Sequence, residues 1–357
     1  MHDSVNGPDV RHMSPGTRIL VAISGGVDSS VAALILKSEG FQVIGVTLKI
    51  WEAFPSKDAK AVADSLSIPH HMVDVTEPFQ NEIVEYFVNE YRQGRTPNPC
   101  VLCNAKIKFR YLIALKAELG AEYVATGHYA RVSFESSKGR FLLRKGRDAT
   151  KDQSYVLHRL TQHDLSSILF PLGNLTKEQV RDAASGAGIP VADKSESQEI
   201  CFLAGTDYRD FLSGYENQVI EPGPILDAAG CLIGKHKGLP FYTVGQRKGI
   251  GIPGSKRLYV TKIDASRNAI IVGEEADLLS DGLEAGDVNW IAYSTPPHRM
   301  RLGIKIRYNA KEVPGLVLPK SQDMAEVVFD TPQRAVTPGQ SVVFYDNDIV
   351  VGGGIIV

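Results

Sequence analysis

The chain has 357 residues, of which 43% are apolar and 22% charged, with a net charge of −2. This length exceeds one ordinary core, so we expect two or three globular domains. No apolar run reaches the length of a membrane span, and the small net charge gives no global argument for nucleic-acid binding. Residues 1–17 contain Asp3 and Asp9 and lack a signal-peptide apolar segment, which predicts a disordered tail and a cytoplasmic protein.

The first strong pattern is the segment 19–30, ILVAISGGVDSS. Its apolar start predicts a strand buried on both faces, and its two glycines allow a sharp turn before a helix over about 28–38. The free N–H groups and the dipole of that helix face the turn, and three serines add hydroxyl donors, so we expect a nucleotide phosphate there. The segment lacks the lysine of a Walker A motif. The alternative is an ordinary strand, turn and helix with capping serines.

Strands and helices then alternate, which predicts right-handed crossovers and a parallel sheet. A ligand of such a sheet lies at the carboxyl ends of the strands. Leu48, at the end of the second strand, is either a wall for an adenine ring or a core leucine. The expected strands are 41–51, 70–75 and 123–130, and the expected helices are 56–67, 80–92 and 176–187.

The four cysteines are Cys100, Cys103, Cys201 and Cys231, too few for a disulfide framework in a cytosolic chain of this size. The first two form a C-x-x-C at the start of a predicted helix. A helix N-terminus and nearby lysines lower a thiol pKa, so we expect reactive thiols here. Half of a zinc site is the alternative, although no second ligand pair follows at finger spacing. An isolated Cys201 before Phe and Leu is by default a small buried hydrophobe.

Basic residues cluster over 92–116 and 144–159, on both sides of the first cysteines. Such runs are usually solvated faces, but their position beside thiols favours a path for a polyanion. His128 follows a glycine at the end of the strand 123–130, where a structural histidine is the alternative to a functional one.

Beyond residue 208, helical periodicity gives way to glycines, prolines and short alternating runs, which are typical of small β domains. The segment 234–252 mixes Lys, Arg and aromatic residues, a combination suited to a phosphate backbone or a nucleobase. The last strands predict a barrel of about six strands. We therefore expect an α/β fold: an N-terminal parallel-sheet domain followed by two small β-rich domains. The expected limits are a tail over 1–17 and domains over 18–208, 209–282 and 283–357.

These segments together resemble the tRNA-specific 2-thiouridylase family of PP-loop ATP pyrophosphatases, from about Arg18 to the C-terminus. The resemblance implies ATP- and magnesium-dependent adenylation of the C2 oxygen of the wobble uridine in tRNAs for Glu, Gln and Lys. Sulfur then replaces that oxygen and leaves 2-thiouridine, AMP and pyrophosphate. The matching motifs are SGGVDSS, GRTPNPCVLCNAKIKF, ATGHYARV, KDQSYVL, PLGNLTKEQVRDAA, SQEICFL, GKHKGLPFYTVGQRKGIGI and VVGGGIIV.

The resemblance also implies three sets of binding residues. ATP is expected at Ala22, Ile23, Ser24, Gly25, Gly26, Val27, Asp28, Ser29, Leu48 and Gly127. The target base is expected at Asn98, Pro99 and Cys100. The remaining tRNA contacts are expected at His128, Lys151, Asp152, Gln153, Arg307, Tyr308 and Gln340.

Two cysteines take catalytic roles by the same resemblance. Cys201 matches the residue that receives sulfur as a persulfide from a sulfur carrier protein or a cysteine desulfurase. Cys103 matches the nucleophile that attacks this persulfide, which frees sulfide and leaves a transient disulfide. The pair must approach to a disulfide's Cα separation of roughly 4.4 to 6.8 Å during the cycle.

The sequence departs from many relatives at Cys100, where they carry Asp, so a general base at this position is in doubt. The three thiols Cys100, Cys103 and Cys201 form an alternative ligand set for an iron–sulfur cluster. Cys231 matches no family role. Another PP-loop ligase, such as argininosuccinate or NAD synthase, would share the ATP site but would not need the cysteine motifs. A tRNA-binding protein without catalysis is disfavoured by the intact SGGVDSS and both cysteines.

Overall fold

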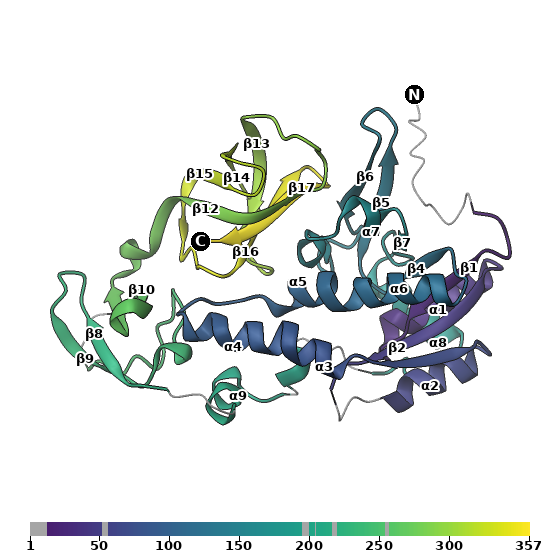
Figure 1. Cartoon of the computed structure of the whole chain (residues 1–357), viewed down its shortest axis with the longest axis horizontal. Helices are drawn as coiled ribbons and strands as arrows, with labels where there is room; N and C mark the ends of the chain where they lie inside the picture. The colour runs from purple at the N-terminus through teal and green to yellow at the C-terminus, as the bar shows by residue number, and fades with distance from the viewer. Residues whose placement is uncertain (1–12, 52–55, 195–199, 204, 216–219, 254–256) are drawn as a thin grey trace.

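The computed structural model describes residues 13–51, 56–194, 200–203, 205–215, 220–253 and 257–357. A parallel sheet with helices forms one end of the molecule, and a barrel and a small mixed sheet form the other (Figure 1). In the described part of the chain, no helix combines the length and apolar character needed to cross a membrane.

The N-terminal sheet has five parallel strands in the order β3-β2-β1-β4-β7, which confirms the predicted parallel sheet. Its central strand is buried on both faces, with Ile19, Leu20 and Val21 fully inaccessible. This explains the continuous apolar run in the sequence. The strands are β1 (Arg18–Ala22), β2 (Gln42–Lys49), β3 (His70–Asp74), β4 (Tyr123–Ala125) and β7 (Ile168–Leu169).

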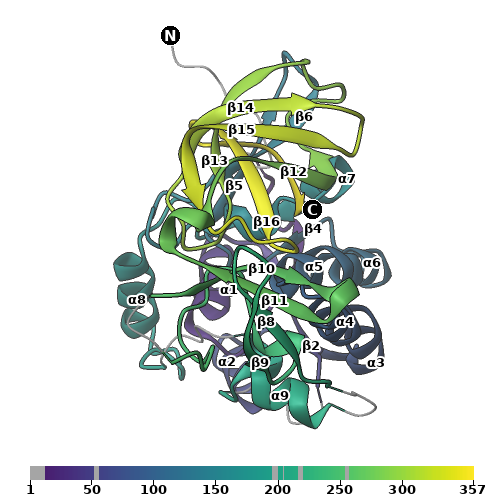
Figure 2. The same ribbon diagram turned by 90° about the vertical axis from the view of Figure 1, so that its left-hand side faces the viewer.

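Helices cover both faces of this sheet (Figure 2). On one face, Ile19 and Val21 pack against α1 (Val27–Ser38), α2 (Ser56–Ser65) and α8 (Lys177–Gly186). On the other face, Leu20, Val46 and Val124 pack against Leu112 of α6 (Arg110–Glu118). Helix α8 begins with a capping box, in which Thr176 and Gln179 satisfy each other's backbone N–H groups.

Two long helical segments leave the sheet, and each contains a π-helical turn. The first runs through α3 (Thr76–Phe79), η2 (Gln80–Val84) and α4 (Glu85–Arg92), so the predicted helix 80–92 begins four residues earlier than expected. The second runs through α5 (Pro99–Cys103), η3 (Asn104–Phe109) and α6. Because π turns are often found at functional sites, the second segment, which carries two cysteines, is of interest.

The predicted single strand over 123–130 is wrong. The structure has β4 up to Ala125, an irregular stretch, and then β5 (Ala130–Glu135), which forms a hairpin with β6 (Arg140–Lys145). The break has a physical cause, because Gly127 lies against the first turn of α1. The chain therefore turns away from the sheet at this point.

The C-terminal strands form a closed barrel in the order β12-β15-β14-β13-β16-β17, closed by pairing of β12 with β17, which confirms the predicted six-stranded barrel. The N-terminal hairpin extends this sheet, because β6 pairs with β17 through Arg144 and Ile349. The barrel strands are β12 (Leu279–Trp290), β13 (Met300–Lys305), β14 (Val313–Pro319), β15 (Ala325–Arg334), β16 (Ser341–Asp346) and β17 (Ile349–Ile356).

Along the chain, the segment between these two parts forms a four-stranded sheet in the order β10-β11-β8-β9. Its core contains Ile225, Tyr242, Val260 and Ile270. The strands are β8 (Gly223–Leu226), β9 (Leu232–His236), β10 (Tyr259–Asp264) and β11 (Ala269–Gly273), and α9 (Tyr208–Gly214) precedes them. Because β12 begins at Leu279, we propose a domain division before residue 279, which keeps this barrel strand whole.

A buried histidine joins the N-terminal domain to the barrel. His158 is fully inaccessible, and a Cβ on Gly353 of β17 would lie only 2.8 Å from its Nδ1. Burial, together with the neighbouring Arg159, lowers the pKa of His158 to about 3. The histidine is therefore neutral in the folded protein at neutral pH.

This histidine predicts a loss of stability in acid. An unfolded histidine binds a proton below about pH 6.5, but His158 does so only near pH 3 when folded, so its contribution is full above pH 6.5 and declines as the pH falls. The slope for one such group is about 1.4 kcal/mol per pH unit. We expect His158→Gln to lose less stability than the wild type between pH 7 and pH 5 in urea denaturation. Identical pH dependence of the two proteins would contradict this assignment.

Candidate active site

The turn between β1 and α1 is held by hydrogen bonds among its serines. Ser24 N–H donates to Ser29 Oγ at 3.1 Å, and the Ser29 and Ser30 hydroxyls donate to the carbonyl of Gly26 at 3.0 and 2.8 Å. Gly25 has φ +75°, and a Cβ there would lie 2.8 Å from Cβ of Asp58. The left-handed conformation and the lack of space both require glycine. The turn is therefore shaped before any ligand arrives.

Two lysines from distant segments approach this turn. Lys177 of α8 lies 2.7 Å from Asp28 Oδ1, which also accepts a hydrogen bond from the Tyr129 hydroxyl at 2.8 Å. Lys194 donates to the Gly25 carbonyl at 3.1 Å and pairs with Asp58 at 2.5 Å. Sequence reasoning missed both lysines, because nothing in their local sequence ties them to a turn about 150 residues earlier. They place positive charge beside a loop that lacks the Walker A lysine.

The residues expected to bind ATP lie together at one edge of the sheet. Residues 22–29 run from the last residue of β1 through the turn into the first turn of α1. Leu48 lies near the end of the adjacent strand β2, and Gly127 follows the adjacent strand β4. A Cβ on Gly127 would lie 2.7 Å from backbone atoms of Asp28 and Ser29, so only glycine allows this approach. Leu48 is half-buried and packs with two apolar clusters, so it also contributes to the core.

The cysteine motif opens the second long helical segment. Asn98 is the N-cap residue of α5, Pro99 begins the helix, and Cys100 and Cys103 follow. Cys201 begins the short helix η5 (Cys201–Leu203), and the neighbouring Phe202 packs in the same apolar cluster as Cys103. The structure therefore brings the two cysteine motifs together, although about 100 residues separate them. All four cysteines of the chain are free thiols. Ser197, Gln198 and Glu199 of the second motif lie outside the described residues.

The expectation of lowered thiol pKa values is wrong in this arrangement. Cys100 and Cys201 reach the solvent and Cys103 is half-buried, but the protein packed around all three thiols still desolvates them. This desolvation raises the pKa of Cys100, raises the pKa of Cys103 to about 11 and, with the neighbouring thiols, raises that of Cys201 to about 12. Lys108 acts in the opposite direction on all three, but more weakly. Cys103 also ends α5 instead of starting it, so the helix N-terminus does not assist it.

The placement of these thiols bears on whether they could bind a metal. Among the described residues, no three side chains of His, Cys, Asp or Glu are grouped in a way that could hold a metal ion. The thiols of Cys100, Cys103 and Cys201 as placed therefore do not form a three-ligand group for an iron–sulfur cluster.

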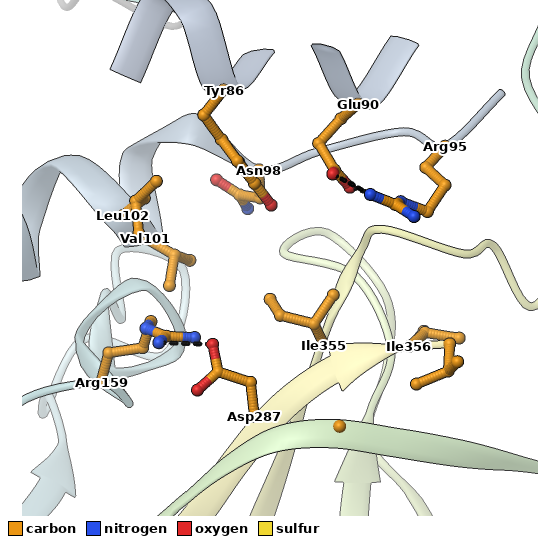
Figure 3. Close-up of a pocket in the computed structure, with 12 residues that line it drawn as sticks. Tyr86, Glu90, Arg95, Asn98, Val101, Leu102, Arg159, Asp287, Ile355 and Ile356 are labelled. Atoms are coloured by element: carbon orange, nitrogen blue, oxygen red, sulfur yellow. Dashed lines mark hydrogen bonds and ion pairs between the residues drawn. The ribbon is translucent and has the colours of Figure 1, made fainter. Parts of the chain in front are cut away.

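Asn98 lines a cavity of about 400 Å³ between α4, α5 and the barrel (Figure 3). Val101 and Leu102 of α5 also line it, whereas Cys100 and Cys103 do not. An ion pair of Arg95 with Glu90 and one of Arg159 with Asp287, the latter at 2.6 Å, border it. The lining residues are Tyr86, Glu90, Arg95, Asn98, Val101, Leu102, Arg159, Gly286, Asp287, Ile355, Ile356 and Val357.

The barrel holds the loop that precedes this cysteine helix. The Gln340 side chain donates to the carbonyl of Thr96 at 2.9 Å, and Thr96 N–H donates to the carbonyl of Pro338 at 2.9 Å. The Thr96 hydroxyl donates to the Thr243 hydroxyl of the central domain at 3.2 Å. Three parts of the chain thus fix the approach to Asn98.

The other residues expected to contact tRNA occupy different environments. His128 is buried, with Nδ1 2.7 Å from the Thr126 hydroxyl, whereas Tyr308 is 37% exposed. Arg307 donates to the Thr337 hydroxyl at 2.6 Å. Asp152 accepts from Gly146 N–H at 2.9 Å, Gln153 accepts from Tyr129 N–H at 3.0 Å, and Lys151 is half-buried in the same loop. These residues therefore range from buried side chains that hold loops in place to the exposed ring of Tyr308.

Models of three known protein domains match consecutive parts of this chain. The model of the tRNA methyl transferase HUP domain matches residues 17–205, that of the tRNA methyl transferase PRC-barrel domain matches 209–274, and that of the aminomethyltransferase beta-barrel domain matches 280–356. The chain is therefore a HUP-domain protein with two appended β domains.

Curated relatives define the family more narrowly. The chain is 48% identical to the tRNA-specific 2-thiouridylase MnmA 2 of Thermoanaerobacter sp. (strain X514), over 96% of this chain and 99% of that protein. It is 48% identical to the tRNA-specific 2-thiouridylase MnmA of Moorella thermoacetica, over 94% and 98%. It is 46% identical to that of Acetivibrio thermocellus, over 95% and 99%. The chain belongs to the tRNA-specific 2-thiouridylase family.

Gly25 and Gly127 lie at the edge of the sheet where ATP is expected to bind, and we expect substitution of either glycine to weaken ATP binding. Alanine at Gly25 or Gly127 would force a backbone shift, because its Cβ would lie under 3 Å from neighbouring atoms. Strain of about 1–3 kcal/mol at such a site corresponds to roughly five- to 150-fold weaker ATP binding. Gly186→Ala is the control, since no neighbouring atom lies within 4 Å of its Cβ. ATP titration with a thermal-shift readout checks this, and unchanged affinity in both variants would contradict it.

The raised thiol pKa values predict slow alkylation at neutral pH. Because the pKa of Cys103 is about 11, its thiolate fraction should rise about tenfold per pH unit up to pH 9. We expect the rate of alkylation of Cys103 by iodoacetamide to rise by the same factor per pH unit. Mass spectrometry of the peptide that contains Cys103 measures this rate. An alkylation rate that stops rising below pH 9 would show that the pKa of Cys103 is lower than this burial predicts.

Proposed function

We propose that this chain catalyses the ATP-dependent conversion of the wobble uridine of tRNA to 2-thiouridine, and is a tRNA-uridine 2-sulfurtransferase. The proposal rests on one observation. In a chain of the 2-thiouridylase family, the motifs of Cys103 and Cys201 meet in one apolar cluster, beside the edge of the sheet where ATP is expected to bind. A ligase without sulfur chemistry would not need two cysteine motifs packed together.

The first step is adenylation of the base. The C2 oxygen of the uridine attacks the α-phosphorus of ATP, an O–P bond forms, the bond to pyrophosphate breaks, and the N3 proton is lost. In this proposal the turn 22–29 binds the phosphates with its backbone N–H groups and the α1 dipole. Lys177 and Lys194 add positive charge near the turn. The step converts a poor electrophile into one with a good leaving group.

Magnesium would accompany the nucleotide and neutralise the leaving pyrophosphate. The carboxylates nearest the turn, Asp28 and Asp58, already pair with Lys177 and Lys194. We therefore propose that magnesium is held mainly by phosphate oxygens and water, as is usual for this ion.

The second step is sulfur transfer. Cys201 carries a persulfide, and the Cys103 thiolate attacks its inner sulfur, so a disulfide forms and hydrosulfide leaves. Hydrosulfide attacks C2 of the adenylated base, the C2–O bond breaks, AMP departs with the oxygen, and the proton of the hydrosulfide ends on N3. A thiol reductant then restores the two cysteines. Because neither thiol has a low pKa, the step needs a base or a local rearrangement when tRNA binds.

The tRNA is proposed to lie across the cysteine helix and the barrel. Asn98, Pro99 and Cys100 would face the target base, and Tyr308 offers an exposed ring for stacking. Gln340 holds the Thr96 carbonyl, so its proposed role is to position the base-binding loop. Lys151 and Arg307 supply charge, whereas Asp152, Gln153 and His128 shape the surrounding loops.

The partners proposed are the tRNAs for Glu, Gln and Lys and a sulfur carrier protein or cysteine desulfurase that loads Cys201. This donor must reach Cys201, whose side chain is exposed. The compartment proposed is the cytoplasm.

Serine substitutions test the two catalytic cysteines. We expect Cys103→Ser and Cys201→Ser each to lower 2-thiouridine formation at least about 1,000-fold, because serine cannot carry or reduce a persulfide. Binding of tRNA should stay within about twofold, since neither change removes charge. Mass spectrometry of nucleosides and filter binding provide the readouts.

The matched control is Cys231→Ser, because Cys231 is an exposed free thiol in the turn between β8 and β9. It should keep wild-type activity. Normal thiolation by either the Cys103 or the Cys201 variant would show that its assigned role is wrong.

A further inference from the structure

Lys108 lies in the π-helical turn η3, on the helical segment that begins with the cysteine motif. Its ammonium donates to Asn104 Oδ1 at 2.9 Å and lies 3.5 Å from Nε2 of His128. Asn104 is itself buried and donates to the carbonyl of Val156 at 3.0 Å. Uncharged groups therefore hold this partly buried lysine in place.

The positive charge of Lys108 is not neutralised by its described neighbours. Lys106 and Arg110, on the same segment, both pair with Glu82, whereas within the described residues Lys108 forms no ion pair. His128 is no counter-charge either, because an imidazole is neutral or cationic. Burial and the nearby ammonium lower its pKa well below 6.5, so it is neutral at neutral pH. A partly buried ammonium without a counter-charge is costly unless an anion reaches it.

Lys108 lies where the two halves of the site meet. On one side, its charge acts on the thiols of Cys100, Cys103 and Cys201. On the other side it approaches His128, and the adjacent Gly127 lies against the first turn of α1. The ammonium is thus between the nucleotide turn and the thiols.

One group in the proposed reaction must span this same gap. The phosphoryl group of the adenylated base is bonded to adenosine on the nucleotide side and to the base oxygen on the thiol side. It is an anion throughout, whereas the thiols are neutral at rest because burial raises their pKa values. A phosphate therefore matches the uncompensated charge better than a resting thiol does.

We propose that Lys108 is a catalytic residue that binds the α-phosphoryl group, first of ATP and then of the adenylated base. This inference rests on the proposed function. Lys108 stabilises the charge that develops as the O–P bond forms and the bond to pyrophosphate breaks. When the C–S bond forms and the C2–O bond breaks, the electron pair leaves with AMP, again beside the ammonium. Lys108 keeps its proton in both steps.

The test separates adenylation from sulfur transfer. Lys108→Met, Lys108→Arg and the control Lys37→Met are compared in tRNA-dependent pyrophosphate release and in 2-thiouridine formation, with ATP, magnesium and unmodified tRNA. Lys37 is an exposed lysine in the last turn of α1. Lys108→Met should lower pyrophosphate release at least about 100-fold, as expected when one preorganised charge donor is removed from a reacting centre. Lys108→Arg should retain activity to within about tenfold, and Lys37→Met to within about twofold.

Pyrophosphate release by Lys108→Met at the wild-type rate would overturn the inference, whether or not thiolation continues. If Lys108→Met does not fold, Lys108→Gln replaces it, since glutamine offers the bond to Asn104 without charge. A Gln variant as fast as the Arg variant would also overturn it. A wild-type protein that forms no 2-thiouridine would instead refute the proposed function, whereas an active wild type with an equally active Met variant would refute only the role of Lys108.

Discussion

The approach of the β4 end to the first turn of α1 determines how the rest of the site is assembled. Gly127 lies so close to Asp28 and Ser29 that no side chain fits between them. This contact ends β4, turns the chain into the hairpin β5–β6, and sets His128 beside Lys108. Because Lys108 belongs to the helical segment that carries two cysteines, one contact between backbones connects the nucleotide edge to the sulfur chemistry.

The second constraint is the docking of the barrel onto the catalytic domain. Strand β6 extends the barrel sheet through its pairing with β17, and Gln340 fixes the carbonyl of Thr96. A Cβ on Gly339 would lie 2.9 Å from the backbone nitrogen of Thr96, so the two loops touch closely. The barrel therefore supports the loop before Asn98 in addition to offering its own surface.

The sequence predicted the features that depend on local pattern. The parallel sheet, the turn after β1 and the six-stranded barrel follow from apolar periodicity, glycine positions and alternation, and the structure confirms them. The strand break at Gly127, and the lysines Lys177 and Lys194, could not be predicted this way. They depend on contacts between segments far apart in the chain.

The pKa values of the thiols could not be predicted from the local sequence either. A motif with lysines nearby predicts a lowered pKa, but burial outweighs the effect of Lys108 at Cys103 and Cys201. Burial is a property of the assembled fold, so the local sequence gave the wrong sign. The meeting of the Cys103 and Cys201 motifs was implied only by family resemblance.

The central claim is that two cysteines transfer sulfur to the ATP-activated tRNA without a bound iron–sulfur cluster. The most direct measurement uses metal-free protein with unmodified tRNA for Lys, ATP, magnesium and a persulfide donor. AMP and 2-thiouridine are quantified together, beside an iron assay. The account predicts 2-thiouridine and AMP in equal amounts without bound iron. Activity that appears only with bound iron, or AMP formation without 2-thiouridine, would contradict it.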